Sequence, residues 1–435
     1  MLANAAVPLL GLVDTAVIGN LGQTADLGAI ALGALVFTFV YWSFGFLRMG
    51  TTGFTAQASG AGDEAEVRAV LGRFSLMAIL LGLLLITLQY PIRELAFSVL
   101  DGSAQVESLA LDYFNVRIWG APATLLTFTL MGLLVGLGNS KQLLLVQLFL
   151  NGINIGLDIY FAGVLELGVK GIALGTVIAE WITVVFALAL IIAELKKRKQ
   201  PEQAFWLADR IFDRQKLMKT ISANADIMIR TLLLVFSFAF FTNQSARFGD
   251  VVLAANHILL QFVSFAAFFL DAYAFVVEAL VGSAVGAGRR DSFDVAVRKS
   301  TILAAITAIA LAIGIWLFGG LLVQLLTDLQ DVRARSQGML YLAAIYIFFS
   351  FAAFQLDGIF IGASSTREMR NAAVMSLVVY LLVWWLLIDR FGVVGLWWSM
   401  IIYVAARADA LLIYFPKLRA SVGEPSSEES LPDQE

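Results

Sequence analysis

The chain has 435 residues, of which 60% are hydrophobic and 14% are charged, with a net charge of −4 and a mean hydropathy of +0.85. These proportions exclude a soluble globular protein, because too few polar residues remain to cover its surface, and they indicate a membrane protein with many spans. The lack of cysteine excludes disulfides and thiolate chemistry, and a single histidine excludes the usual metal sites and argues against an enzyme.

The first predicted span covers residues 2–20 and contains Asp14 in the stretch LLGLVDTAVIG. An aspartate at the centre of a membrane helix costs roughly 2.5–3.5 kcal/mol, so this carboxylate must be compensated or functional. Pro8 cannot donate a hydrogen bond to the carbonyl four residues earlier, which makes it a candidate hinge. The span is barely long enough to cross a bilayer. We therefore expect the complete protein to begin before Met1, and we do not expect a cleaved signal peptide.

Hydrophobic runs of spanning length continue along the rest of the chain, separated by short polar breaks. Together with the first span they predict an all-α polytopic membrane protein of twelve transmembrane helices. The predicted domains are an N-terminal six-helix lobe (1–195), a cytoplasmic linker (196–218), a C-terminal six-helix lobe (219–417) and a disordered acidic tail (418–435). The predicted helices after the first are 27–56, 68–91, 107–137, 142–164, 168–194, 219–246, 252–283, 294–326, 334–362, 371–389 and 393–416.

The two lobes share a sequence repeat with a nearly constant displacement, which indicates a duplicated bundle. Because each repeat has an even number of predicted spans, we expect a pseudo-two-fold axis along the membrane normal between two six-helix bundles. The matched segments are ASGAG (58–62) with AVGAG (284–288) and Gly132/Gly136 with Gly358/Gly362, all displaced by 226, and LGVKG (167–171) with FGVVG (391–395), displaced by 224.

The distribution of basic residues predicts the orientation of the chain, because positive charge is retained on the cytoplasmic side. Most of the 29 Lys and Arg residues fall in the loops on the side that holds both termini, which we therefore place in the cytoplasm. The opposite loops hold only Arg93, Lys170, Arg247, Arg333, Arg335 and Arg390.

The ionisable residues do not follow the repeat. Asn151, Asn154 and Asp158 lie at positions i, i+3 and i+7 of one helix, and a polar stripe in a membrane helix must face the bundle interior. The spacing lets the Asn154 amide donate to Asp158. If Asp14 meets this stripe, two carboxylates share a low-dielectric pocket and can hold one proton between them near neutral pH. In the second repeat, Phe240 stands at the position of Asp14, Tyr380 at that of Asn154 and Trp384 at that of Asp158.

The second repeat has its own acidic residues at membrane depth. Asp271, Glu278 and Asp357 are candidates for substrate binding or gating, with satisfied interior carboxylates as the alternative. Asn151 is a further candidate for substrate contact, with helix packing as the alternative. Asp226 and Arg230, four residues apart, are expected to form an intrahelical ion pair.

Three segments resemble the multidrug and toxic compound extrusion (MATE) transporters, in particular their DinF-like branch. VPLLGLVDTAVIGNLG is similar to the first helix of that branch. FLRMGTTGFTAQASGAG is similar to its second helix and the loop after it, and LDGIFIGASSTREMRNA to its tenth helix. The resemblance covers nearly the whole chain.

The resemblance implies a V-shaped pair of six-helix lobes that exports organic cationic or amphipathic compounds against an inward flow of protons, with sodium as the alternative ion. It places ion coupling at Asp14, Asn154 and Asp158, which the residue pattern also reaches. Thr176 and Tyr113 join this site by resemblance alone. The protein is then expected in the bacterial inner membrane, as a monomer that uses no cofactor beyond its coupling ion.

Two other functions compete with multidrug efflux. A flippase for lipid-linked precursors would need a cationic cavity for pyrophosphate, whereas most basic residues lie in loops. An intramembrane enzyme would have to rely on carboxylate pairs alone. The expected partners are small organic molecules and the lipid bilayer, without nucleic acid, since the basic stretch 196–219 is interpreted as a linker at anionic headgroups.

Overall fold

The structure, a computed structural model, describes residues 24–99, 103–198 and 204–423. These residues form helices and connecting turns, and no strand occurs among them. Ten helical segments of this described part are long and apolar enough to cross a membrane. The predicted all-α membrane fold is confirmed, and the predicted first span, with Pro8 and Asp14, lies outside the described residues.

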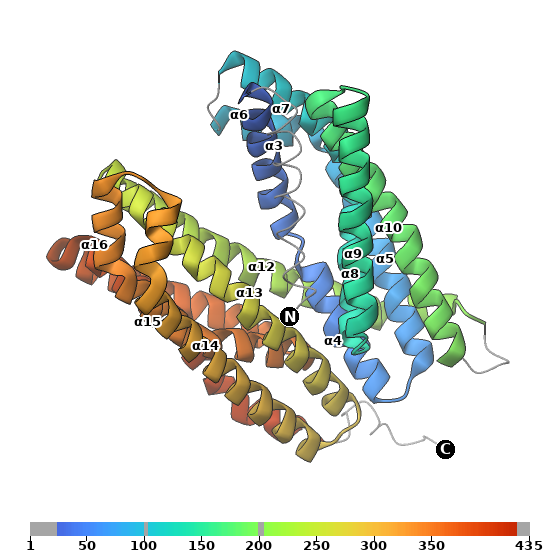
Figure 1. Cartoon of the computed structure of the whole chain (residues 1–435). Helices are drawn as coiled ribbons and strands as arrows, with labels where there is room; N and C mark the ends of the chain where they lie inside the picture. The colour runs from blue at the N-terminus through green and yellow to red at the C-terminus, as the bar shows by residue number, and fades with distance from the viewer. Residues whose placement is uncertain (1–23, 100–102, 199–203, 424–435) are drawn as a thin grey trace. The chain divides into compact units, whose positions relative to one another are not determined.

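The described chain divides into two compact units, which are coloured along the chain in Figure 1. The N-terminal unit comprises residues 24–55 and Asp63–Ile221, and the C-terminal unit comprises Ala56–Gly62 and residues 222–423. The N-terminal unit therefore includes the basic segment that follows its last long helix.

The N-terminal unit packs α9 beside α10, α5 beside α8 and α3 beside α7 (Figure 1). Three predicted helices are interrupted: 27–56 at residues 43–45, 68–91 at Leu88, and 107–137 at a 3-10 turn. The last break follows from Pro122, which cannot donate to the carbonyl of Ile118. The elements are α3 (Thr24–Trp42), α4 (Phe46–Gly60), α5 (Glu64–Thr87), α6 (Gln89–Val99), α7 (Ala104–Arg117), η1 (Ile118–Gly120), α8 (Ala121–Gly136), α9 (Ser140–Asp158), the π-helix η2 (Ile159–Val164), α10 (Gly168–Arg198) and α11 (Ala208–Ile211).

The C-terminal unit is built around α15, which packs against α13, α14 and α16. Helix α16 bends at Gly392, whose φ of 54° and ψ of −129° are not helical, so it contains both predicted helices 371–389 and 393–416. The predicted disordered tail is wrong at its start, because α16 continues to Ser421 and Arg419 donates to both Asp294 carboxylate oxygens at 2.6 and 2.7 Å. The elements are α12 (Arg214–Ala246), α13 (Asp250–Gly286), α14 (Arg290–Leu326), α15 (Gln330–Gly362) and α16 (Thr366–Ser421).

The sequence repeat is visible in the backbone of both units. Helix α15 spans the residues that match α7, η1 and α8, and α13 spans those that match α3 and α4, each displaced by 226. Residues with positive φ recur at the same places: Gly62 and Gly288 at 74° and 62°, Gly138 and Ser364 at 70° and 54°, and Gly168 and Gly392 at 54° each. The predicted duplication is therefore reproduced at its turns as well as in its helices.

Paired glycines four residues apart bring two helices into backbone contact in each unit, as small residues at this spacing often do in membrane proteins. A Cβ atom at Gly136 would lie 2.7 Å from the carbonyl oxygen of Thr52, and one at Gly132 would collide with that of Arg48. In the C-terminal unit a Cβ at Gly358 would lie 2.7 Å from the carbonyl oxygen of Ala274, the residue that matches Arg48. The same helix crossing is thus built twice.

Gly132→Ala is expected to destabilise the protein by about 1–3 kcal/mol, because the new methyl group has no space against α4. Gly152→Ala on α9 is the matched control, since nothing lies within 4 Å of its Cβ position. The control should leave stability unchanged or raise it slightly through helix propensity. Thermal unfolding in detergent measures both variants, and equal midpoints would contradict the close crossing.

The basic segment that follows α10 is held on the N-terminal end of α5. Asp63 caps α5 through the N–H of Glu66 and binds the Arg210 guanidinium at 2.6 and 2.8 Å. Glu66 binds Lys216 at 2.6 Å, and Arg73 donates to the carbonyl oxygen of Arg210 at 2.8 Å. These contacts give the segment partners within the chain itself, beyond the anionic headgroups considered from the sequence.

The Asp63 pair predicts an acid-sensitive contact. Burial alone raises the pKa of Asp63, but the Glu66 N–H, the hydrogen bonds from Arg210 and the charges of Arg210 and Lys216 outweigh it, so the pKa lies below its ordinary value. The stability that Asp63 contributes is therefore present above about pH 4 and is lost as the pH falls through the lower folded-state pKa. Wild type should unfold at a higher temperature than Asp63→Ala at pH 7. A difference that persisted unchanged at pH 2.5 would contradict this assignment.

Candidate functional site

A buried polar layer joins α9 to α10 in the N-terminal unit. Asn154 and Asp158 are 0% exposed, and Thr176 on α10 is 2% exposed. The Asn154 amide donates to Thr176 Oγ1 at 3.3 Å, and that hydroxyl donates to the carbonyl oxygen of Ile172 at 3.0 Å. The predicted hydrogen bond from Asn154 to Asp158 is wrong, because the amide reaches across to the neighbouring helix. The predicted burial of the stripe is confirmed, with Asn151 8% exposed.

The position of the Asp158 carboxylate is set by a glycine on α10. A Cβ atom at Gly175 would collide with Asp158 Oδ1, so the carboxylate lies directly against the helix backbone there. Asp158 is also the last residue of α9 before the π-helix η2. Single-turn π-helices are rare and often lie at functional positions.

Tyr113 belongs to the packing between α7 and α3. It is 3% exposed, and a Cβ at Gly33 would lie 2.5 Å from its Cδ1 atom. Its ring meets that of Phe37 edge to face, with centroids 6.3 Å apart. The structure thus brings Asn154, Asp158 and Thr176 together and places Tyr113 on the adjoining helix pair.

A second buried layer holds an ion pair between α7 and α10. Arg117 and Glu180 are 7% and 5% exposed, and the guanidinium donates to the two carboxylate oxygens at 2.6 and 2.9 Å. Thr124 on α8 donates to the same carboxylate at 2.9 Å. The rings of Phe37 and Tyr41 lie 5.5 Å from the guanidinium carbon.

Neither member of this pair was singled out from the sequence. The available signal was the charge itself, since both residues lie at membrane depth. A Cβ at Gly120 would lie 2.6 Å from Arg117 Nη1 and 2.7 Å from Glu180 Oε2, so the glycine of η1 leaves room for the pair.

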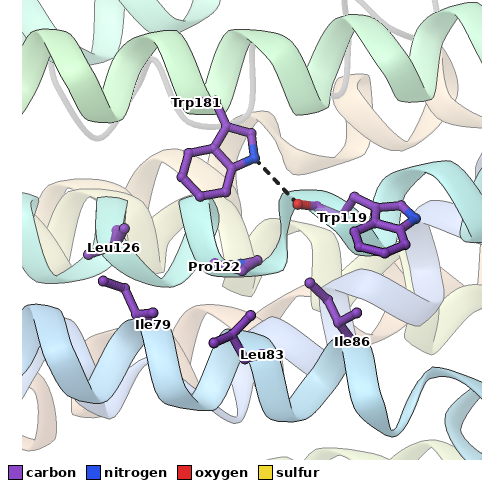
Figure 2. Close-up of a pocket in the computed structure, with 7 residues that line it drawn as sticks. All are labelled: Ile79, Leu83, Ile86, Trp119, Pro122, Leu126 and Trp181. Carbon is purple, nitrogen blue, oxygen red and sulfur yellow. Dashed lines mark hydrogen bonds between the residues drawn. The ribbon is translucent and has the colours of Figure 1, made fainter.

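An apolar groove lies outside this layer, between α5, η1, α8 and α10 (Figure 2). Its volume is about 420 Å³, and Trp181 donates to the carbonyl oxygen of Trp119 at 3.4 Å across one end. A second groove, in the C-terminal unit, is lined by residues at matching positions of the repeat. Ile309 there matches Leu83, and Phe348 matches Pro122. The repeat therefore reproduces this apolar surface, in contrast to the charged layers beneath it. Figure 2 shows the lining residues Ile79, Leu83, Ile86, Trp119, Pro122, Leu126 and Trp181.

The C-terminal unit has aromatic rings where the N-terminal unit has its polar layer. Tyr380 and Trp384 match Asn154 and Asp158, and Phe240 contacts both of them edge to face at centroid distances of 5.7 and 5.0 Å. The predicted asymmetry of the two repeats therefore extends to their packing.

Asp357 is the centre of a charged cluster in the C-terminal unit. Its Oδ2 atom accepts from Arg407 at 2.6 Å and also from Arg230. Asp226 instead accepts from Arg370 at 2.7 Å and from Thr366 at 3.2 Å. The predicted Asp226–Arg230 pair within one helix is wrong, because each residue meets a better partner on a neighbouring helix.

The other acidic candidates of this unit lie on α13. Glu278 is 1% exposed, and Asp271 is half-buried. Gly362 packs against the backbone of Glu278, so Glu278 belongs to the glycine crossing between α13 and α15.

Comparison with known proteins extends over both repeats. The MatE family matches residues 1–160 and 227–386. DNA damage-inducible protein F of Escherichia coli is 34% identical over 413 residues, which cover 94% of this chain and 88% of that protein. The probable multidrug resistance protein NorM of Pasteurella multocida is 23% identical over 442 residues, covering 97% and 92% of the two chains.

Solved structures share the fold. MATE in the straight conformation superposes with a TM-score of 0.84 at 19% identity, covering 97% of this chain and 94% of that one. An outward-facing multidrug resistance MATE family transporter of the MOP superfamily gives 0.85 at 18% identity with the same coverage. The resemblance found in the three sequence segments is thereby confirmed, and the chain belongs to the MATE family of multi-pass membrane transporters, with similarity to its DinF members.

Proposed function

We propose that this protein exports organic molecules by proton-coupled antiport through alternating access, with the buried layer of Asn154, Asp158 and Thr176 as part of its coupling site. The names of several relatives, such as NorM, support multidrug efflux as the activity. The observation that carries the proposal is a carboxylate that is 0% exposed in one repeat, where the other repeat has aromatic rings. The free-energy cost of a carboxylate buried at membrane depth is high unless a cation or a proton compensates its charge.

The repeat supports a place for Asp14 in this site. Phe240, which matches Asp14, contacts Tyr380 and Trp384, which match Asn154 and Asp158. If the first repeat follows the same arrangement, Asp14 would lie beside Asn154 and Asp158, and two neighbouring carboxylates in a low-dielectric site would share one proton. Pro8, six residues earlier, would then be the hinge that links protonation to a bend of the first helix.

Asn154 has a buried acceptor that a proton on a neighbouring carboxyl group would satisfy. Its amide nitrogen is already used on Thr176, and its Oδ1 atom is buried without a hydrogen-bond partner among the described residues. A protonated carboxyl group is a donor and can satisfy this oxygen, whereas two carboxylates without a proton cannot. The carboxylate pair with one proton is therefore better hydrogen-bonded than the pair without a proton.

Coupling requires that protonation and substrate binding oppose each other. The protonated state must bind substrate more weakly than the deprotonated state, because a ligand with equal affinity for both states does not change the equilibrium between them. With both termini in the cytoplasm of a bacterial inner-membrane protein, proton entry from the outside then drives release of an organic cation there. A monomer suffices for this cycle, because both repeats belong to one chain.

The rival functions find less support. A lipid-linked precursor flippase needs free cationic groups for pyrophosphate, but Arg230 and Arg407 both bind Asp357. Membership of a family of transporters favours transport over an intramembrane carboxylate enzyme.

Ethidium transport into everted membrane vesicles tests the proposal. Wild type should accumulate ethidium when a pH gradient is applied, and Asp14→Asn should not, because the variant cannot exchange a proton at this position. Asp112→Asn is the matched control: its side chain is 39% exposed and pairs with Lys170 of α10. Transport by Asp14→Asn at the wild-type rate would refute the coupling role.

A further inference from the structure

We propose that the Arg117–Glu180 ion pair is a positioning element that raises the proton affinity of the coupling site beside it. The inference rests on the proposed function, because it assigns a role to the second buried layer in the same ion cycle. Neither residue touches the transported ion; they act through the electric field of a fixed, buried pair.

The repeat shows that the fold does not need these charges. The matched positions in the C-terminal unit are Ala343 and Val404, both buried, and α15 runs through the place where the N-terminal unit breaks at η1. A buried ion pair is also often no more stabilising than apolar residues of similar volume. Charges at these two positions are therefore not a requirement of the repeated bundle, whose second copy has its buried charges elsewhere, at Asp357, Arg230 and Arg407.

Both members of the pair lie one helical turn from the coupling layer. Glu180 follows Thr176 by four residues on α10, and Arg117 follows Tyr113 by four residues on α7, so each pair of side chains shares one face of its helix. Asp158 lies against Gly175, five residues before Glu180. At a rise of about 1.5 Å per residue, the Glu180 position is roughly 7.5 Å further along the helix axis.

The pair is held rigidly, so its field is permanent. Glu180 accepts two bonds from Arg117 and one from Thr124, and the guanidinium is flanked by the Phe37 and Tyr41 rings. Side chains from α3, α7, α8 and α10 thus fix two charges away from water. In such surroundings a unit charge at 8–10 Å changes a neighbouring proton affinity by about one pH unit.

The order of the two charges gives the direction of the effect. Glu180 belongs to α10, the helix against which Asp158 lies, whereas Arg117 belongs to α7 on the other side of the pair. We therefore take Glu180 as the nearer of the two charges to Asp158, and a negative charge there favours protonation. Among the described residues, the other titratable side chains around the two layers are Tyr41 on α3 and Tyr113 on α7. Asp14, outside the described residues, is the further carboxylate that the proposed function assigns to the coupling site.

The test measures the pH at which protons displace half of the bound ethidium from the purified protein. Glu180→Gln leaves the Arg117 charge uncompensated and should lower this midpoint by about one pH unit, and Arg117→Gln should raise it by a similar amount. The double variant Arg117→Ala/Glu180→Val carries the residues of the C-terminal unit. It should fold and should have a midpoint below wild type but above that of Glu180→Gln.

The outcomes separate this inference from the proposed function. Asp112→Asn/Lys170→Gln removes an exposed ion pair between the same two helices and should leave the midpoint unchanged. If a single variant does not fold, the double variant alone decides, because its midpoint must lie below that of wild type. Midpoints equal to wild type, or shifts of both single variants in one direction, overturn the inference while proton coupling stands. Ethidium binding by wild type that does not depend on pH overturns both.

Discussion

Asp158→Asn is expected to abolish ethidium accumulation driven by a pH gradient, with transport falling to the level of vesicles that lack the protein. Asparagine has the shape of aspartate but carries neither the negative charge nor an exchangeable proton near neutral pH. The carboxylate is 0% exposed and lies against Gly175, so the substitution changes the charge of the site with little change in its volume.

The matched control for this prediction is Glu166→Gln, which neutralises an exposed carboxylate in the short connection after η2. It should transport as wild type does. Size-exclusion chromatography of both variants shows whether a loss of transport reflects a loss of folded protein. A folded Asp158→Asn protein that still responds to the pH gradient would contradict the assignment of this residue.

Asp357→Ala has the largest expected effect on stability, about 3–5 kcal/mol. The substitution leaves Arg230 and Arg407 without the carboxylate that both bind, and the three side chains are only 9–11% exposed. An uncompensated buried charge costs far more than the net value of the pair that it formed. Thermal unfolding in detergent should therefore begin at a much lower temperature than in wild type.

Two further variants define this effect. Adding Arg230→Met to Asp357→Ala removes one of the stranded charges and should recover part of the lost stability. Asp294→Ala breaks the exposed pair with Arg419 and should change stability little. Equal melting temperatures for Asp357→Ala and Asp294→Ala would show that the central cluster is not the electrostatic support described here.

Much of the fold could be predicted from the sequence because the membrane imposes simple rules. Spans of about twenty apolar residues locate helices, and the repeat displaced by 226 residues locates matched crossings, such as Gly132 and Gly358. The burial of Asn154 and Asp158 follows from their spacing on one face of a helix and from the cost of polar groups in lipid.

Partners on different helices could not be predicted in the same way. Spacing within one helix suggested an Asp226–Arg230 pair, but it carries no information about which residue of another helix lies opposite. The structure pairs Asp226 with Arg370 and Arg230 with Asp357. The break before α8 was available in the sequence, because Pro122 lies in the middle of a predicted span.

Proton release on substrate binding tests the central claim most directly. Ethidium is added to purified protein in a weakly buffered detergent solution, and the change in pH is recorded near the midpoint of the proton–ethidium competition. If Asp158 belongs to the site that holds the proton displaced by substrate, wild type releases protons and Asp158→Asn binds ethidium without releasing any. Equal proton release by the two proteins would contradict the account.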